Sequence, residues 1–118
     1  MSTQPNRASD YLAHMGEAIG LACSFVDGLT KEDFLSDRKT QQAVILNLIV
    51  LGEAATKIAT EVPEFVAAHP EIPWQQMRGM RNRMAHGYFD INLDVVWDTV
   101  QMSLPALQRQ LASLPLYR

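Results

Sequence analysis

The chain has 118 residues, of which 47% are apolar and 19% are charged, a balance that excludes a disordered protein and suits a single folded domain. It carries 10 Lys and Arg against 13 Asp and Glu, and the formal net charge of −3 argues against a protein that coats nucleic acid through bulk charge, although a local basic site stays open. Its one cysteine, Cys23, excludes an internal disulfide and a zinc site built from several cysteines.

The first predicted helix covers residues 12–26, where apolar side chains recur at three- and four-residue steps. Ser9 or Asp10 suits its N-terminal cap, and Gly28 suits its end. Residues 30–35 then match an N-terminal capping signature followed by a short helical turn. The first part of the chain therefore predicts one long helix and one extra turn.

The second predicted helix covers residues 38–61, and its apolar residues occupy more than one face. A stripe this wide predicts burial on two sides, against the chain's own helices or also against a partner. Gly52 and Ala54 permit the close approach of another helix, while Glu53 between them could pair with an arginine or face water. The longest apolar stretch, residues 43–51, is far shorter than the roughly 20 residues needed to span a bilayer.

Proline and glycine mark the limits of the last two predicted helices. Pro73 suits the first turn of a third helix, and Gly87 suits its end. The fourth helix begins near Asp90 or Asn92, and Pro105 predicts a kink or a local break within it. The sequence shows neither a useful alternating strand pattern nor an internal repeat.

These elements predict an all-α fold, an antiparallel bundle of four main helices with short extra helical turns. We expect one domain over residues 10–114, a flexible N-terminus over residues 1–9 and a tail over residues 115–118. The polar N-terminus lacks the apolar run of a secretory signal, so we expect a cytoplasmic protein without a membrane segment.

The segment most informative about function is residues 78–88. No acidic residue occurs between Glu71 and Asp90, yet this segment holds three arginines, a histidine and a tyrosine. They are Arg78, Arg81, Arg83, His86 and Tyr88. Arginine donates paired hydrogen bonds to phosphate and histidine transfers protons near neutral pH, so both suit cleavage of a phosphodiester.

The same residues also fit structural roles. Arginines near a helix C-terminus commonly complement its dipole, and His86 could cap carbonyl groups there. Asn82 could be a structural hydrogen-bonding residue, and Tyr88 could be a half-buried core aromatic. Residues five apart on a helix point about 140° apart. Arg81 and His86 therefore converge within one chain only if the helix ends or loosens before His86, which Gly87 permits.

The order Arg81-Asn82-x-x-x-His86-x-Tyr88 resembles the Arg-x4-His-x-Tyr motif of HepT-like proteins, in the HEPN superfamily. The flanking sequence is also similar to that family at residues 10–12, 43–55, 73–74 and 94–97. The resemblance runs over residues 10–114, and it implies an all-helical homodimer.

The resemblance also implies a function. HepT-like proteins are toxins of type VII toxin–antitoxin pairs and are described as metal-independent RNases, so we expect an endoribonuclease that uses no metal or other cofactor. Arg81 and His86 would be catalytic, and two copies of the motif would face each other across the dimer. Tyr88 would receive AMP from the cognate antitoxin, an MntA-like minimal nucleotidyltransferase, which would silence the toxin. The residues expected to bind the phosphates of the RNA are Arg78, Asn82 and Arg83.

Two other functions stay open. A non-catalytic module, which binds a nucleotide or serves as the acceptor subunit of a nucleotidyltransferase, fits the same cationic segment. A purely structural bundle would leave residues 78–88 without a purpose. We also expect a dimer whose interface is formed by the second helix and the last helix.

Overall fold

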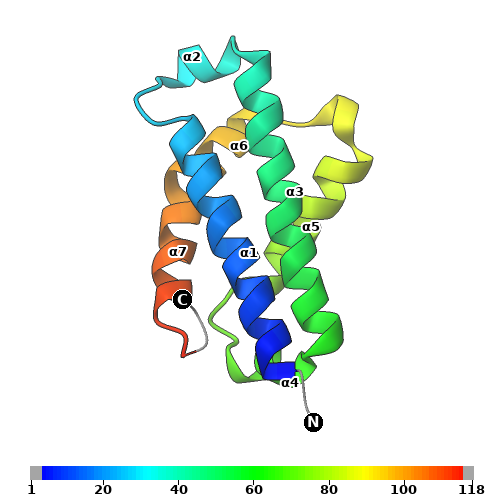
Figure 1. Cartoon of the computed structure of the whole chain (residues 1–118). Coiled ribbons are helices and arrows are strands. Elements are labelled where there is room, and N and C mark those ends of the chain that lie inside the picture. The colour runs from blue at the N-terminus through cyan, green and yellow to red at the C-terminus, as the bar shows by residue number, and fades with distance from the viewer. Residues whose placement is uncertain (1–3, 116–118) are drawn as a thin grey trace.

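The computed structural model describes residues 4–115, and this part of the chain is helical and contains no strand. The elements in chain order are α1 (Gln4–Phe25), α2 (Lys31–Leu35), α3 (Arg38–Glu61), α4 (Pro63–Ala68), α5 (Trp74–His86), η1 (Tyr88–Asp90), α6 (Leu93–Asp98), η2 (Thr99–Ser103) and α7 (Leu104–Ala112). Four main segments, which are α1, α3, α5 and the run from α6 to α7, alternate in direction (Figure 1). The predicted all-α antiparallel bundle with short extra turns is confirmed. Residues 1–3 and 116–118, which belong to the predicted N-terminus and tail, lie outside the described residues.

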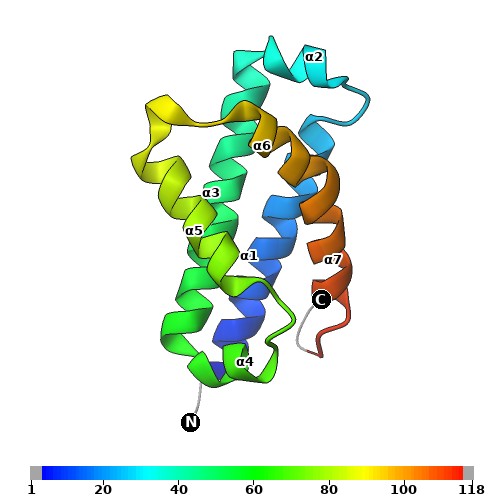
Figure 2. The same cartoon turned by 180° about the vertical axis from the view of Figure 1, so that it is seen from behind.

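Helix α3 is the central element of the bundle, because it packs against α1 on one side and against α5 on another (Figure 2). Val44, Leu48 and Ile58 are buried along its length, and so are Ile45 and Gly52 on a second face. Burying one large aliphatic side chain stabilises a fold by about 1.5–3 kcal/mol, so this helix dominates the core. The two-sided burial predicted from its wide apolar stripe is confirmed.

By length and composition, α3 could also cross a membrane, because an 18-residue window within it reaches a mean hydropathy of 1.5. The expectation that the chain has no membrane segment rested, for this helix, on the uninterrupted apolar stretch 43–51 alone. It did not consider the mean hydropathy of the whole helix. However, 44% of the window is buried inside the fold, and α3 packs against two other helices. The core helix of a helical bundle can be equally long and apolar, and α3 is such a core helix.

Local capping determines where several elements begin and end. Gly28 follows α1 with φ +79°, a backbone conformation that residues with a side chain rarely adopt. The Thr30 hydroxyl accepts from the backbone N–H of Asp33, whose carboxylate accepts in turn from the backbone N–H of Thr30. Asn92 caps α6 through its side-chain oxygen. The signals predicted at these three places are confirmed.

The predicted cap of α1 at Ser9 or Asp10 is wrong, because α1 begins at Gln4. Tertiary contacts hold this first turn and a half in the helix. The guanidinium of Arg7 lies 2.6 Å from the Glu61 carboxylate at the end of α3, and Ala8 is fully buried. The helix therefore extends to where α3 ends, which local sequence signals could not show.

The run from α6 to α7 bends through a π-helical turn. In this turn the N–H of Leu104 donates to the carbonyl of Thr99, five residues earlier. Pro105 follows in the first turn of α7 and has no N–H to donate to the preceding turn. The predicted irregularity at Pro105 is confirmed, and it takes the form of a wider turn. The half-buried Cys23 thiol faces the Val100 carbonyl of the same turn at 3.9 Å, and burial raises the pKa of this thiol.

Candidate active site

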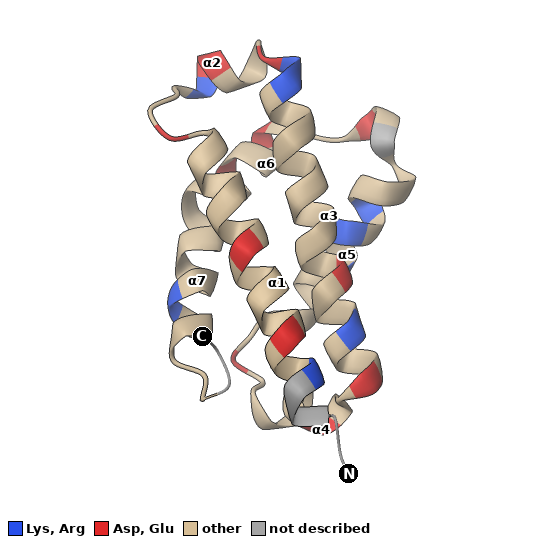
Figure 3. Ribbon diagram, in the orientation of Figure 1, with Lys and Arg blue, Asp and Glu red and all other residues tan. Residues whose placement is uncertain are grey.

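Helix α5 carries the motif and is fixed by one buried face. The indole N–H of Trp74 donates to the carbonyl of His69 at 2.9 Å, and Trp74 is buried together with Met77 and Met84. The helix begins at Trp74, so Pro73 precedes its first turn by one residue. The apolar face of α5 rests on α3. Arg78, Arg83 and His86 are exposed, whereas Arg81 is only partly exposed. The arginines of α5 are coloured blue on the ribbon in Figure 3.

Helices α3 and α5 approach each other closely at Gly52. A Cβ atom at position 52 would lie 2.3 Å from Cβ of Arg81 and 2.7 Å from the carbonyl oxygen of Met77. Atoms cannot approach so closely, so only glycine fits unless the helices shift. The close helix approach predicted at Gly52 is therefore confirmed, and it occurs at the arginine of the motif.

The guanidinium of Arg81 is held by two side chains. Its Nη2 lies 3.0 Å from Oε1 of Glu53 on α3, and its Nη1 donates to Oδ1 of Asn82 at 2.7 Å. The Arg81 side chain is 22% exposed, and its Nε is buried without a hydrogen-bond partner among the described residues. Residues 78–88 contain no acid in sequence, but the fold supplies Glu53 from a neighbouring helix. Of the two roles open to Glu53, the structure shows the ion pair.

Arg81 and His86 do not converge within one chain. Helix α5 stays regular through His86, because the N–H of Gly87 donates to the carbonyl of Arg83 at 2.8 Å. Two residues five apart on such a helix point about 140° away from each other. The loosening that would bring them together before His86 is absent, while His86 itself is exposed at the helix end.

The other predicted phosphate-binding residues are accessible. Arg78, Asn82 and Arg83 are all exposed. In the part of the chain that the structure describes, the guanidinium groups of Arg78 and Arg83 form no ion pair, so their charges are available to a ligand. Asn82 instead binds Arg81, so the structural role that the sequence left open for it is present.

Tyr88 begins the short helix η1, directly after the C-cap of α5 at Gly87. The turn is closed by the N–H of Asp90, which donates to the carbonyl of Gly87 at 2.9 Å. The side chain of Tyr88 lies outside the described part of the structure. Phe89 beside it is 97% exposed, so this turn projects into solvent.

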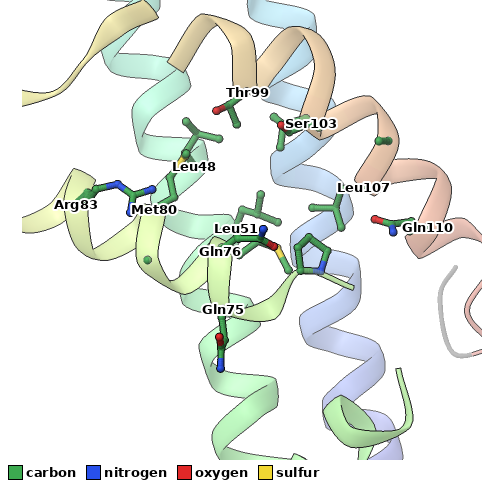
Figure 4. Close-up of a pocket in the computed structure, with 15 residues that line it drawn as sticks. Leu48, Leu51, Gln75, Gln76, Met80, Arg83, Thr99, Ser103, Leu107 and Gln110 are labelled. Atoms are coloured by element: carbon green, nitrogen blue, oxygen red, sulfur yellow. The ribbon is translucent and has the colours of Figure 1, made fainter. Parts of the chain in front are cut away.

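A groove of about 650 Å³ lies beside the motif and was not predicted from the sequence (Figure 4). Leu48 and Leu51 of α3 line it, together with residues of α5 on one side and of η2 and α7 on the other. Arg83 lies at one end and Gln110 at the other. Its residues come from distant parts of the chain, so only the packing of the helices reveals it.

The side chains that could bind a metal ion do not form a cluster in the described part of the chain. Among residues 4–115, no group of three or more His, Cys, Asp or Glu side chains is placed to hold a metal ion. His69 lies 3.4 Å from the carboxylate of Glu71, and its ring contacts that of Phe65 at a tilt of 47°, with ring centroids 4.6 Å apart. His14 is exposed on α1. Both histidines therefore occupy structural or surface positions rather than a metal site among the described residues.

Fold and site together define an all-helical protein in which Arg, Asn, His and Tyr follow at fixed spacing on one basic helix end. The family described as Ribonuclease HepT-like matches residues 15–114. The chain belongs to this family, and the family and enzyme class predicted from the motif are confirmed.

Individual relatives agree with the family. A protein of Thermococcus cleftensis named "Probable ribonuclease HepT" is 42% identical over 105 residues, which cover 89% of this chain and 93% of the relative. A Methanocaldococcus jannaschii protein with RNase in its name is 36% identical over 81% of this chain and 74% of its own length. A Caldanaerobacter subterraneus protein, also with RNase in its name, is 30% identical over 88% and 90% of the two chains. No solved structure matches the chain.

Proposed function

We propose that this protein is a cytoplasmic endoribonuclease toxin that cleaves RNA with Arg81 and His86, without a metal ion. Membership of the HepT-like ribonuclease family supports an RNase function. The observation that carries the site assignment is the arrangement on α5, where a clamped, partly exposed Arg81 precedes an exposed His86 at the helix end. An imidazole can transfer the protons of phosphodiester cleavage, and a guanidinium can stabilise the negative charge that develops on the phosphoryl oxygens.

The chemistry uses the RNA's own 2′-hydroxyl as the nucleophile. One His86 accepts the proton of this hydroxyl while its oxygen bonds to the phosphorus. A second, protonated His86 gives a proton to the 5′-oxygen as the bond from phosphorus to that oxygen breaks. Arg81 stabilises the negative charge that grows on the phosphoryl oxygens. The products are a 2′,3′-cyclic phosphate and a free 5′-hydroxyl, so atoms and charge balance without a co-reactant.

The active form is a homodimer in this proposal. Each chain supplies one His86, and its Arg81 points about 140° away from that histidine on a regular helix. A second copy related by twofold symmetry brings the missing group to each half of a shared cleft. The groove between α5 and α7, floored by Leu48 and Leu51 and next to Arg83, is the surface that we assign to the second copy.

Silencing acts at Tyr88. We propose that an MntA-like nucleotidyltransferase attaches AMP to the hydroxyl of this tyrosine. Tyr88 lies two residues after His86, at the start of the turn that follows α5. The added phosphate would bring negative charge and a bulky base next to Arg78, Arg81 and Arg83, and would exclude RNA by both.

The test is cleavage of a single-stranded RNA by the purified protein in the presence of EDTA. We expect cleavage by the natural chain and a loss of about a hundred- to ten-thousandfold in rate for His86→Ala. His14→Ala, which removes an exposed histidine on α1, is the matched control and should cleave normally. Full activity of His86→Ala would exclude this mechanism.

The same experiment separates the main alternative. A non-catalytic nucleotide-binding or acceptor subunit would bind a nucleotide or a nucleotidyltransferase, but it would neither cleave RNA nor arrest growth when expressed. Binding without turnover by the natural chain would therefore favour the acceptor function.

A further inference from the structure

We propose that Gly52 and Glu53 on α3 are positioning residues that fix the guanidinium of Arg81 for RNA cleavage; the inference rests on the ribonuclease function proposed above. Neither residue belongs to the Arg-x4-His-x-Tyr motif. Gly52 packs against Cβ and Cγ, which we call the root of the Arg81 side chain, and Glu53 binds the guanidinium, which we call its head.

Gly52 fixes the root of Arg81. Cβ of Arg81 occupies the space in which a side chain at position 52 would begin, since a Cβ there would lie only 2.3 Å away. Cγ of Arg81 lies 3.1 Å from the same point, so the first two carbons of the side chain run along the α3 backbone. The carbonyl of Met77 closes the contact from the other side, at 2.7 Å. The absence of a side chain at Gly52 therefore sets how close Arg81 comes to α3.

Glu53 fixes the head of Arg81. Its carboxylate binds Nη2, and Asn82 binds Nη1, so the guanidinium plane is held from two sides. A guanidinium has five N–H groups, and these two bonds leave one N–H on each terminal nitrogen for a phosphate. The buried Nε has no hydrogen-bond partner in the described chain, so the donors open to a ligand are those on the terminal nitrogens.

Positioning and simple charge repulsion give opposite kinetic results for Glu53→Gln. Because the carboxylate is 50% exposed beside the site, removing its charge should help an anionic RNA to bind and should lower KM or leave it unchanged. If Glu53 positions Arg81, the same change should lower kcat, because the guanidinium loses its fixed direction in the transition state. A fall in kcat without a rise in KM therefore identifies a positioning residue.

The experiment measures kcat and KM for the natural chain, Glu53→Gln and Gly52→Ala in EDTA at fixed salt. We expect kcat to fall roughly tenfold for Glu53→Gln and about a hundredfold for Gly52→Ala, because a misplacement near 1 Å can cost that much. Two controls match these changes. Glu17→Gln removes an exposed carboxylate on α1, and Gly20→Ala adds a Cβ where nothing lies within 4 Å. Unchanged kcat in Glu53→Gln would overturn the proposal.

A second readout does not depend on cleavage or on the folding of Gly52→Ala. The Nε–H of Arg81 should give a slowly exchanging signal in a ¹H–¹⁵N spectrum of the natural chain, because Nε is buried. Its absence from the spectrum of Arg81→Lys assigns it. We expect Glu53→Gln to shift this signal and speed its exchange, whereas Glu17→Gln should leave it unchanged. An Nε–H signal with the same position and exchange rate in Glu53→Gln would show that Glu53 does not hold the guanidinium of Arg81. A natural chain that cleaves no RNA would instead overturn the ribonuclease function and leave this readout intact.

Discussion

The carboxylate of Glu53 lies 3.0 Å from Nη2 of Arg81 and joins the two helices on which the candidate site is built. Half of the Glu53 side chain is exposed, and an exposed ion pair contributes only about 0–1 kcal/mol to stability. The packing of Gly52 against the same arginine has a larger effect, because it involves backbone atoms that have no free space to move into. Stability at this junction is therefore determined by Gly52, and the direction of the guanidinium by Glu53.

Gly52→Ala should destabilise the fold by about 1–3 kcal/mol, the usual cost of overfilling a packed contact. The added Cβ collides with Arg81 and with the backbone of Met77. Urea denaturation at neutral pH measures the change. Gly20→Ala is the control, since its new Cβ meets open space and alanine favours a helix by about 0.5–1 kcal/mol over glycine. Equal stability of the two variants would contradict the close packing of α3 against α5.

Glu61 should make the fold more stable at neutral than at acid pH. The hydrogen bond from Arg7 holds the pKa of Glu61 below the usual value of 4.5, with a smaller effect from Tyr11, while burial opposes both. A carboxylate with a lowered folded-state pKa stabilises the fold above the unfolded value, and this contribution disappears as pH falls through the folded value. Glu61→Gln should therefore melt at a slightly lower temperature than the natural chain at pH 7, and the difference should shrink as pH falls below 4.5 and through the folded-state pKa.

The control for this pH dependence is Glu64→Gln, because Glu64 is exposed on α4 and forms no ion pair with the described residues. Its thermal unfolding should follow that of the natural chain at every pH. A difference between Glu61→Gln and the natural chain that is as large at pH 3 as at pH 7 would show that the Arg7 contact does not cause the effect.

Ala106→Arg should convert the proposed dimer to a monomer. Ala106 is half-buried in the wall of the groove on α7, where we place the second copy, and a long charged side chain would fill that space. Light scattering at micromolar concentration measures the mass. Gln108→Arg adds the same charge at an exposed position of α7 outside the groove and should stay dimeric. A dimeric Ala106→Arg protein would place the interface elsewhere.

Tyr88→Phe should remain toxic but escape silencing. The change removes only the hydroxyl that would carry AMP and keeps the charges of α5. Growth after expression, with and without the cognate nucleotidyltransferase, measures both properties. We expect the enzyme to rescue cells that express the natural chain but not those that express Tyr88→Phe. Rescue of the variant, or AMP found on it by mass spectrometry, would show that another residue is the acceptor.

The sequence predicts features that depend on local chemistry. Hydroxyl and amide side chains cap helices at Thr30 and Asn92, glycine permits the turn at Gly28, and Pro105 cannot continue a regular hydrogen-bond pattern. In each case the physical cause lies within about five residues of the position, so a reading of neighbouring residues is sufficient. The motif itself is local in the same sense.

Features that depend on distant contacts were predicted poorly or not at all. The first turns of α1 exist because Arg7 reaches Glu61 on another helix. The segment around Arg81 appears free of acid until the fold brings Glu53 to it. The groove exists only where three helices meet. Some sequence signals did point to such contacts. Gly52, a small residue in an apolar helix, indicated close packing, and Glu53 beside it was a possible partner of an arginine.

The most direct test of the shared site places one His86→Ala chain beside one natural chain in a dimer. The two chains carry different tags and are co-expressed, and dimers that hold one of each are isolated through both tags. The proposed cleavage uses one His86 to accept a proton and the second His86 to donate one, so this mixed dimer should lose activity as severely as a dimer of two His86→Ala chains. A mixed dimer that keeps about half of the natural activity would show that each chain cleaves with its own His86 and that the two chains share no site.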